Sequence, residues 1–156
     1  MELQYGRVKR SAGILLYRRT PELQVLLGHM GGPFWARKDE HAWSIPKGEH
    51  TEEEDPLAAA RREFAEEIGS PAPEAVVPLG VVRGSKTLTV WAAEGDLDAE
   101  ATVSNTFSLE WPPRSGNVQE FPEIDRTAWL DLETAAIKLV KGQLPFLDRL
   151  AELLGR

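Results

Sequence analysis

Short apolar runs separated by turn-forming residues dominate the first two thirds of the chain, a pattern that predicts β-strands. These runs are residues 10–17, 23–28, 42–46, 75–82 and 87–93, with a further candidate strand near 102–111. A turn at Thr20-Pro21-Glu22 separates the first two runs. Loops are predicted at residues 29–41, which include Gly and Pro, and at residues 119–125, before a strand that starts near Trp129-Leu130.

A helix is predicted between Asp55 and Gly69. Asp55 can cap the free N–H groups of a first turn, and Pro56 sits where its missing donor does no harm. Gly69 can adopt the left-handed conformation that ends a helix, and Pro71 prevents continuation. At about 100° per residue the helix has two distinct faces. One is apolar, with Leu57, Ala60, Phe64 and Ile68, and another carries Glu63, Glu66 and Glu67.

Two more helical segments are predicted towards the C-terminus, over residues 132–140 and 145–154, where apolar residues recur at helical spacing. Strands combined with one central and one terminal helical block predict an α/β fold, in which helices flank a mixed β-sheet. The 156 residues show no repeat, linker or break in composition. We therefore expect a single domain over residues 1–156.

Composition places the chain among globular proteins and excludes several kinds of chemistry. Hydrophobic residues make up 42% and charged residues 28%, and no apolar run approaches the roughly 20 residues of a membrane span. The N-terminus lacks the apolar core of a secretory signal. Cysteine is absent, which excludes disulfides, thiolate metal sites and a cysteine nucleophile. We expect a cytoplasmic protein with no membrane partner, and both a monomer and a homodimer are compatible with the sequence.

Negative charge is concentrated in one segment. Residues 49–67 hold eight acidic side chains and two basic ones, a net of −6 out of the chain's −7. This acidity argues against a nonspecific nucleic-acid binder, which needs a basic face. Glu63, Glu66 and Glu67 lie within about one turn of the helix near its C-terminus, where like charges and the helix dipole disfavour them. A cation such as Mg²⁺ would neutralise them, but a solvated acidic face is equally compatible with these three residues alone.

The spacing around these acids decides between the two interpretations. Five residues separate Gly48 from Glu54, and seven more precede residues 62–69 (REFAEEIG). This pattern resembles the Nudix box, G-x5-E-x7-R-E-U-x-E-E-x-G-U, in which U is a bulky apolar residue. A chance match to its fixed positions has odds on the order of one in a million. Ser70 departs from the last position, which is a packing site. The resemblance implies a Nudix hydrolase with an α/β/α sandwich fold.

The resemblance also implies a role for each residue of the box. Glu63, Glu66 and Glu67 would bind Mg²⁺, or Mn²⁺ as a substitute, together with the Gly48 carbonyl, and Glu63 could also serve as general base. Glu54 and Arg62 would form an ion pair that holds the loop against the helix. Metal ions that bridge the phosphates would offset charge and help generate hydroxide for in-line attack on phosphorus.

Residues outside the box complete the predicted site. In similar enzymes an acid from a later loop reaches the metals as a ligand or base, and Glu123, six residues before Trp129, is the candidate. A small-molecule nucleotide substrate also needs positive charge around its phosphates. The substrate-binding candidates are Lys47, Arg37, Lys38 and Lys86, with Trp43 as a ring on which a base stacks. The competing interpretation is a solvated base for each cation and a core or rim position for Trp43.

Three local features resemble the diadenosine polyphosphate hydrolases of this family: Trp43 before Pro46-Lys47-Gly48, Lys86-Thr87 before Trp91-Ala92, and Glu123 before Trp129-Leu130. They make a dinucleoside polyphosphate the leading substrate among nucleoside diphosphate derivatives. The alternatives are a (deoxy)nucleoside triphosphate, including oxidised ones, and then sugar nucleotides and inositol pyrophosphates. A Nudix-fold nucleotide sensor without catalysis is the alternative of another class. Such a sensor would be expected to lose box carboxylates, and all of them are present here.

Overall fold

A mixed β-sheet of seven strands forms the centre of residues 9–156, which are the residues that this computed structural model describes. Its strands are β1 (Lys9–Arg18), β2 (Gln24–Met30), β3 (Trp43–Ser44), β4 (Lys47–His50), β5 (Val77–Val82), β6 (Lys86–Glu94) and β9 (Ile124–Asp131). The order along the sheet is β3-β2-β1-β6-β5, while β4 also pairs with β1 and β9 with β2. β1 and β6 are parallel, and the other pairs are antiparallel. The expectation that the N-terminus is no secretory signal falls largely outside the described residues.

β1 lies at the centre of the sheet because its side chains are apolar on both faces. Ile14 and Leu16 belong to the core on one side of the sheet, and Leu15 and Tyr17 belong to the core on the other side. Successive side chains of a strand point to opposite faces. An unbroken apolar run such as β1 is therefore typical of a strand that is buried on both faces of the sheet.

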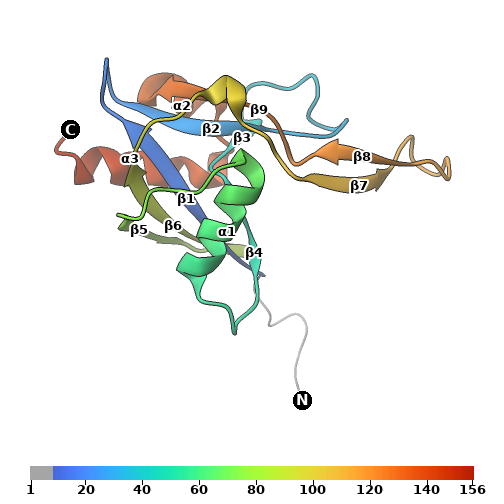
Figure 1. The fold of residues 1–156 in the computed structure, drawn as a ribbon, viewed down its shortest axis with the longest axis horizontal. Helices are drawn as coiled ribbons and strands as arrows, with labels where there is room; N and C mark the ends of the chain where they lie inside the picture. Colours follow the sequence, from blue (N-terminus) through green and yellow to red (C-terminus); the bar gives the residue numbers. More distant parts are fainter. Residues whose placement is uncertain (1–8) are drawn as a thin grey trace.

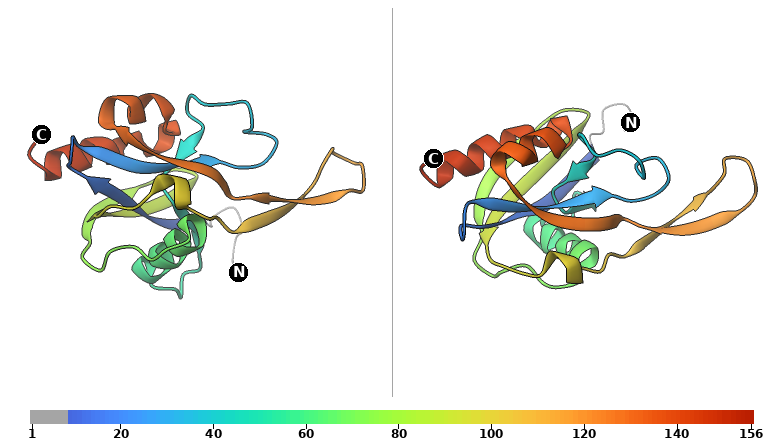
Figure 2. Two further views of the ribbon diagram at one scale, coloured as in Figure 1. Left: turned by 45° about the horizontal axis from the view of Figure 1, so that its top comes forward. Right: turned by 90° about the horizontal axis from the view of Figure 1, so that it is seen from above.

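Helices cover both faces of this sheet, as the two views of Figure 2 show. They are α1 (Pro56–Ile68), α2 (Leu132–Lys138) and α3 (Leu144–Leu153), with 3-10 turns η2 (Ala99–Ala101) and η3 (Lys141–Gln143). α1 packs Ala60 and Phe64 into the core that contains Ile14, whereas α3 packs Phe146 and Leu150 into the opposite core. The predicted α/β/α sandwich is confirmed. Among the helices within residues 9–156, none has the length and apolar character needed to cross a membrane.

The predicted signals set both ends of α1. The Asp55 carboxylate accepts a hydrogen bond from the Ala58 N–H at 3.0 Å, and Pro56 is the first helical residue. At the other end Gly69 adopts a left-handed φ of 89°, which a residue with a Cβ atom disfavours. These local signals determine where the acid-bearing face of α1 begins and ends.

A second, two-stranded sheet projects from the body of the protein (Figure 1). It pairs β7 (Thr106–Glu110) with β8 (Val118–Pro122), and Phe107 lies opposite Phe121. The predicted loop over residues 119–125 is therefore wrong, because most of it is strand, and β9 begins at Ile124 rather than near Trp129. β7 lies within the strand predicted near residues 102–111, whereas β8 is mostly exposed and lacks the apolar run that marks a buried strand. Glu123 is the one residue between β8 and β9.

Candidate active site

β4 brings Lys47 and Gly48 to the place where α1 presents its acids. The strand pairs with β1, with Gly13 opposite Lys47 and Ala12 opposite Gly48. A Cβ atom on Gly48 would collide with the carboxyl group of Glu63. The absence of a side chain on Gly48 therefore lets the Glu63 carboxyl group lie directly against β4.

An open cavity of about 440 Å³ lies at this contact. It is lined by Glu63, Glu66 and Glu67 of α1, by Lys47, Gly48 and Glu49 of β4, and by Met30, Ser44, Asn105, Glu123 and Ile124. The structure thus brings together all four predicted catalytic acids, the predicted glycine and one predicted phosphate-binding lysine. No sequence motif marks Met30, Ser44 or Asn105, which come from segments far apart in the chain.

Burial raises the pKa of three acids around this cavity. Glu67 is only 8% exposed, and burial, followed by the neighbouring Glu63 carboxylate, raises its pKa to about 8. Burial likewise raises the pKa of Glu63, with the charge of Glu66 as the next cause. Glu123 is exposed as a residue, but partial desolvation of its carboxyl group raises its pKa as well. The Lys47 ammonium opposes all three shifts. These carboxyl groups are costly to ionise together, so a bound cation would stabilise the site.

The pKa of Glu67 predicts how the metal-free protein responds to pH. A pKa raised from 4.5 to about 8 on folding means that the folded state binds the proton more tightly, so its contribution to stability is complete below about pH 4.5 and is lost towards pH 8. We expect the free energy of unfolding in EDTA to fall by up to a few kcal/mol over this range. Urea unfolding at pH 5, 6.5 and 8 measures it, with Glu67→Gln as control. Equal pH slopes in both proteins would contradict the shift.

A divalent cation fits this site by the chemistry of its donors. Carboxylate and carbonyl oxygens are the ligands that Mg²⁺ prefers, and Glu63, Glu66, Glu67 and Gly48 line one cavity. The Glu63 carboxyl group occupies the position that a Cβ atom on Gly48 would take, so it lies next to the backbone of Gly48. Within residues 9–156 no three acidic or histidine side chains already converge as ready-made ligands. The carboxyl groups would therefore have to draw together around a bound ion.

Arg62 links the loop before α1 to the acids. One of its terminal nitrogens, Nη2, lies 3.2 Å from Glu54 Oε2 and 3.5 Å from Glu63 Oε2. Glu54 also accepts a long hydrogen bond from the Thr51 N–H at 3.4 Å. The predicted partners are therefore in contact, and the same arginine also touches a predicted metal ligand.

A double-mutant cycle with Glu54→Ala and Arg62→Ala measures the strength of this pair. Because both side chains are about 40% exposed, solvent weakens the attraction, and we expect a coupling free energy of about 0.5–1 kcal/mol in urea unfolding. Arg62→Ala should also reduce kcat, since it releases Glu63 as well as Glu54. Strictly additive stability changes would show that the two side chains do not interact.

The backbone of Glu123 is held by two other segments. The Gly31 N–H donates to the Glu123 carbonyl at 2.9 Å, and the Glu123 N–H donates to the Asn105 carbonyl at 2.9 Å. A Cβ atom on Gly31 would collide with the backbone carbonyl of Pro122. Glu123 therefore reaches the cavity from a hydrogen-bonded junction between two strands rather than from the long loop predicted.

A second cavity, of about 290 Å³, lies beside the first and shares Lys47 with it. Lys86, a predicted phosphate-binding residue, lines this second cavity together with Arg83 and the apolar side chains of Val82 and Leu88. The Ser11 hydroxyl also lines it, and this buried hydroxyl has no hydrogen-bond partner in the part of the chain that the structure describes. Arg83 stands three residues before Lys86, the first residue of β6. Lys86 was singled out from the sequence but Arg83 was not, although the short spacing between these two bases was a signal for both.

The structure contradicts the prediction that Trp43 stacks on a base. Its side chain is only 3% exposed, and its indole N–H donates to Asp39 Oδ1 at 2.9 Å. Arg126 and Lys138 lie 5.2 and 5.6 Å from the centre of the ring. Trp43 is therefore a core residue with no free face for a ligand.

Arg37 and Lys38 are exposed and line neither cavity. Lys38 places its ammonium 5.3 Å from the centre of the Trp35 ring, on its own loop. Of the predicted substrate-binding residues, only Lys47 and Lys86 lie at the cavities.

Comparison with known proteins shows which family has this fold. The model of the NUDIX domain family matches residues 7–150, so the chain belongs to the Nudix family. It is a Nudix hydrolase, a pyrophosphohydrolase. A related protein, the RNA pyrophosphohydrolase of Bartonella henselae, is 32% identical over 145 residues, which cover 81% of this chain and 78% of the relative.

Solved structures show the same fold at lower sequence identity. A C. elegans Ap4A hydrolase in a binary complex superposes with a TM-score of 0.64 at 22% identity, covering 93% of this chain and 98% of that one. The NUDIX domain of Shewanella oneidensis NrtR, crystallised with ADP ribose, gives 0.66 at 17% identity and covers 95% and 89%. At such identities the likeness establishes the fold alone.

Proposed function

We propose that this protein uses Mg²⁺, with Mn²⁺ as a possible substitute, to hydrolyse a diphosphate linkage in a nucleoside diphosphate derivative, and that its leading substrate is a dinucleoside polyphosphate. The observation that carries this proposal is the pair of adjoining cavities that share Lys47. One is lined by acids that suit a metal-bound phosphate, and the other combines bases with apolar side chains.

Each residue of the first cavity has a role in this proposal. Glu63, Glu66, Glu67 and the Gly48 carbonyl would hold the cation, while Arg62 and Glu54 keep the loop against α1. When bound, Mg²⁺ supplies positive charge to the phosphate oxygens and activates water for attack on phosphorus. Glu123, which lines the same cavity from the junction of β8 and β9, would accept a proton from the attacking water. Lys47 binds the phosphate chain between the two cavities.

The second cavity favours a substrate that extends beyond the bond to be cut. Lys86 and Arg83 supply charge for further phosphates, and Val82, Leu88 and Val140 supply an apolar surface for a nucleoside. A dinucleoside polyphosphate uses both cavities at once, because its phosphate chain has a nucleoside at each end. A small nucleotide such as a nucleoside triphosphate would leave part of this surface unused.

The 5′-polyphosphate end of RNA is the second candidate substrate. The similarity to the RNA pyrophosphohydrolase of Bartonella henselae favours it, and such an end also places a phosphate chain beside a nucleoside. The net charge of −7 weighs against it, because a long RNA needs basic surface beyond the first nucleotides.

Chromatographic separation of the nucleotide, phosphate and pyrophosphate products formed from diadenosine tetraphosphate, ATP and 5′-triphosphorylated RNA, each with Mg²⁺ and with EDTA, tests the proposal. We expect Mg²⁺-dependent turnover with the highest kcat/KM for the dinucleoside. Lys86→Ala should raise KM for it about tenfold, the effect of losing one charge-assisted contact, whereas Arg37→Ala, a control outside both cavities, should not. Preference for RNA would select the second candidate. Saturable binding without turnover of any substrate would identify a sensor.

A further inference from the structure

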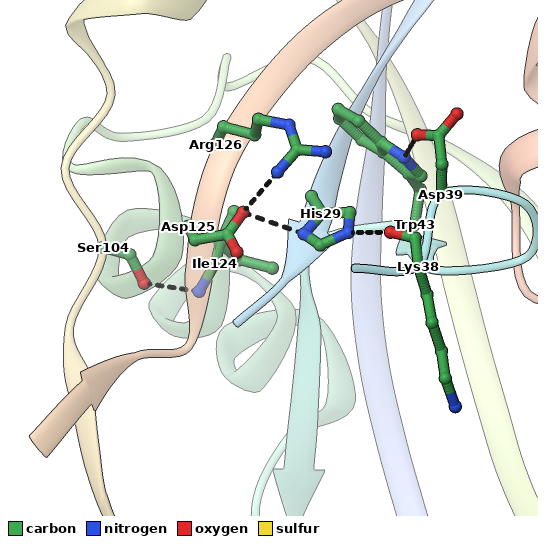
Figure 3. Close-up of polar contacts among 8 residues, drawn as sticks. All are labelled: His29, Lys38, Asp39, Trp43, Ser104, Ile124, Asp125 and Arg126. Atoms are coloured by element: carbon green, nitrogen blue, oxygen red, sulfur yellow. Dashed lines mark hydrogen bonds and ion pairs between the residues drawn. The ribbon is translucent and has the colours of Figure 1, made fainter. Parts of the chain in front are cut away.

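His29 is a fully buried polar side chain beside the candidate active site. It is 0% exposed on β2, and both of its ring nitrogens have partners (Figure 3). Nδ1 lies 2.9 Å from Asp125 Oδ1, and Nε2 lies 2.6 Å from the backbone carbonyl of Lys38. The rings of His29 and Trp43 pack edge to face, with 5.3 Å between their centroids.

Each nitrogen of the imidazole is hydrogen-bonded to a different segment of the chain. The Lys38 carbonyl can only accept, so Nε2 donates to it. The Asp125 oxygen that lies beside Nδ1 also lies 3.3 Å from the Arg126 guanidinium. A fully buried polar ring that joins two segments in this way suggests a role beyond packing.

His29 joins these two segments at the point where Glu123 enters the cavity. Asp125 follows Glu123 by two residues, and Lys38 belongs to the loop between β2 and β3. Ile124, which lies between Glu123 and Asp125, donates its N–H to Ser104 Oγ at 3.1 Å. The Asp125 side chain is thus the next anchor along β9 after the backbone hydrogen bonds of Glu123 and Ile124.

We propose that His29 is a positioning residue for Glu123: the hydrogen bond between its Nδ1 and Asp125 fixes the strand junction that presents the Glu123 carboxyl group to the cavity, while the bond between Nε2 and the Lys38 carbonyl orients the ring. The inference rests on the proposed catalytic role of Glu123. It assigns His29 no contact with substrate or metal.

Two substitutions of His29 separate its two hydrogen bonds. Asparagine places an amide near the position of Nδ1 and can still donate to Asp125, whereas glutamine places an amide near Nε2 and can donate only to the Lys38 carbonyl. Both remove ring volume from the same core. We expect His29→Gln to lower kcat at saturating Mg²⁺ and substrate by about ten- to a hundredfold with little change in KM, and His29→Asn to remain within about threefold of wild type.

The matched control for lost stability is Thr127→Val on the same strand. Thr127 Oγ1 donates to the Ala99 carbonyl at 2.7 Å and shares a hydrogen bond with Thr102 Oγ1 at 2.8 Å, away from the Glu123 junction. This variant should lose thermal stability while keeping wild-type kcat. Equal kcat losses in His29→Asn and His29→Gln would overturn the proposal, because a purely structural role does not distinguish the two nitrogens.

A double variant tests whether His29 acts through Glu123. If it does, His29→Gln should lower kcat no further in a Glu123→Gln background. Full additivity of the two kcat losses would overturn the inference while leaving the catalytic role of Glu123 intact. Wild-type kcat in Glu123→Gln alone would instead overturn the proposed role of Glu123, and the inference with it.

Discussion

Glu67→Gln is expected to lower kcat by on the order of a hundred- to a thousandfold, the usual cost of losing one charged contact that stabilises the transition state. Glu67 is the most buried acid of the cavity, at 8% exposed. In the proposed site it is a cation ligand, so its neutral isostere should also weaken Mg²⁺ binding. The amide has the shape of the protonated carboxyl group, so the metal-free variant should be at least as stable as wild type at pH 8.

Steady-state kinetics across a Mg²⁺ titration measure both effects. Glu53→Gln removes an equal charge from the exposed loop before α1, outside the cavity, and it should leave kcat and the Mg²⁺ dependence unchanged. Near-normal kcat for Glu67→Gln at saturating Mg²⁺ would remove Glu67 from the proposed set of ligands.

Glu123→Gln is expected to lower kcat about a hundredfold, as the loss of a general base does, while Mg²⁺ affinity falls by much less. The reason is position: Glu123 lies at the junction of β8 and β9, whereas Glu63, Glu66 and Glu67 come from α1. An acid that acts mainly on the attacking water affects turnover more than it affects the resting metal site. Glu67→Gln, by contrast, is expected to weaken Mg²⁺ binding as well as to lower kcat.

Glu120→Gln is the matched control for this prediction. Glu120 precedes Glu123 by three residues, but its carboxylate accepts a hydrogen bond from Thr106 Oγ1 at 3.1 Å within the hairpin and does not line the cavity. Its substitution should leave kcat and Mg²⁺ binding unchanged. If Glu120→Gln lost activity and Glu123→Gln did not, the strand junction would be the right region and Glu123 the wrong residue. If neither variant lost activity, catalysis would belong to α1 alone.

The features that the sequence determined by itself are local ones. Asp55, Pro56 and Gly69 set the ends of α1, and the i, i+3, i+4 spacing placed Glu63, Glu66 and Glu67 towards one cavity. The contact between Glu54 and Arg62 could be predicted from the family motif for a similar reason, because both residues belong to the same loop and helix. Helical geometry and capping involve neighbours within a few residues, so a short segment contains the information that specifies them.

Features that depend on distant segments were decided only by the tertiary structure. Acidic residues have the same spacing along a helix whether their face is solvated or buried. Glu67 is buried because α1 packs against β1 and β4. Trp43 resembled a stacking platform in sequence but is enclosed by Arg126 and Lys138. His29 meets its partner Asp125 across 96 residues of chain. Burial and hydrogen-bond partners of this kind arise when separate strands pair, and a single sequence contains no local signal for which strands will do so.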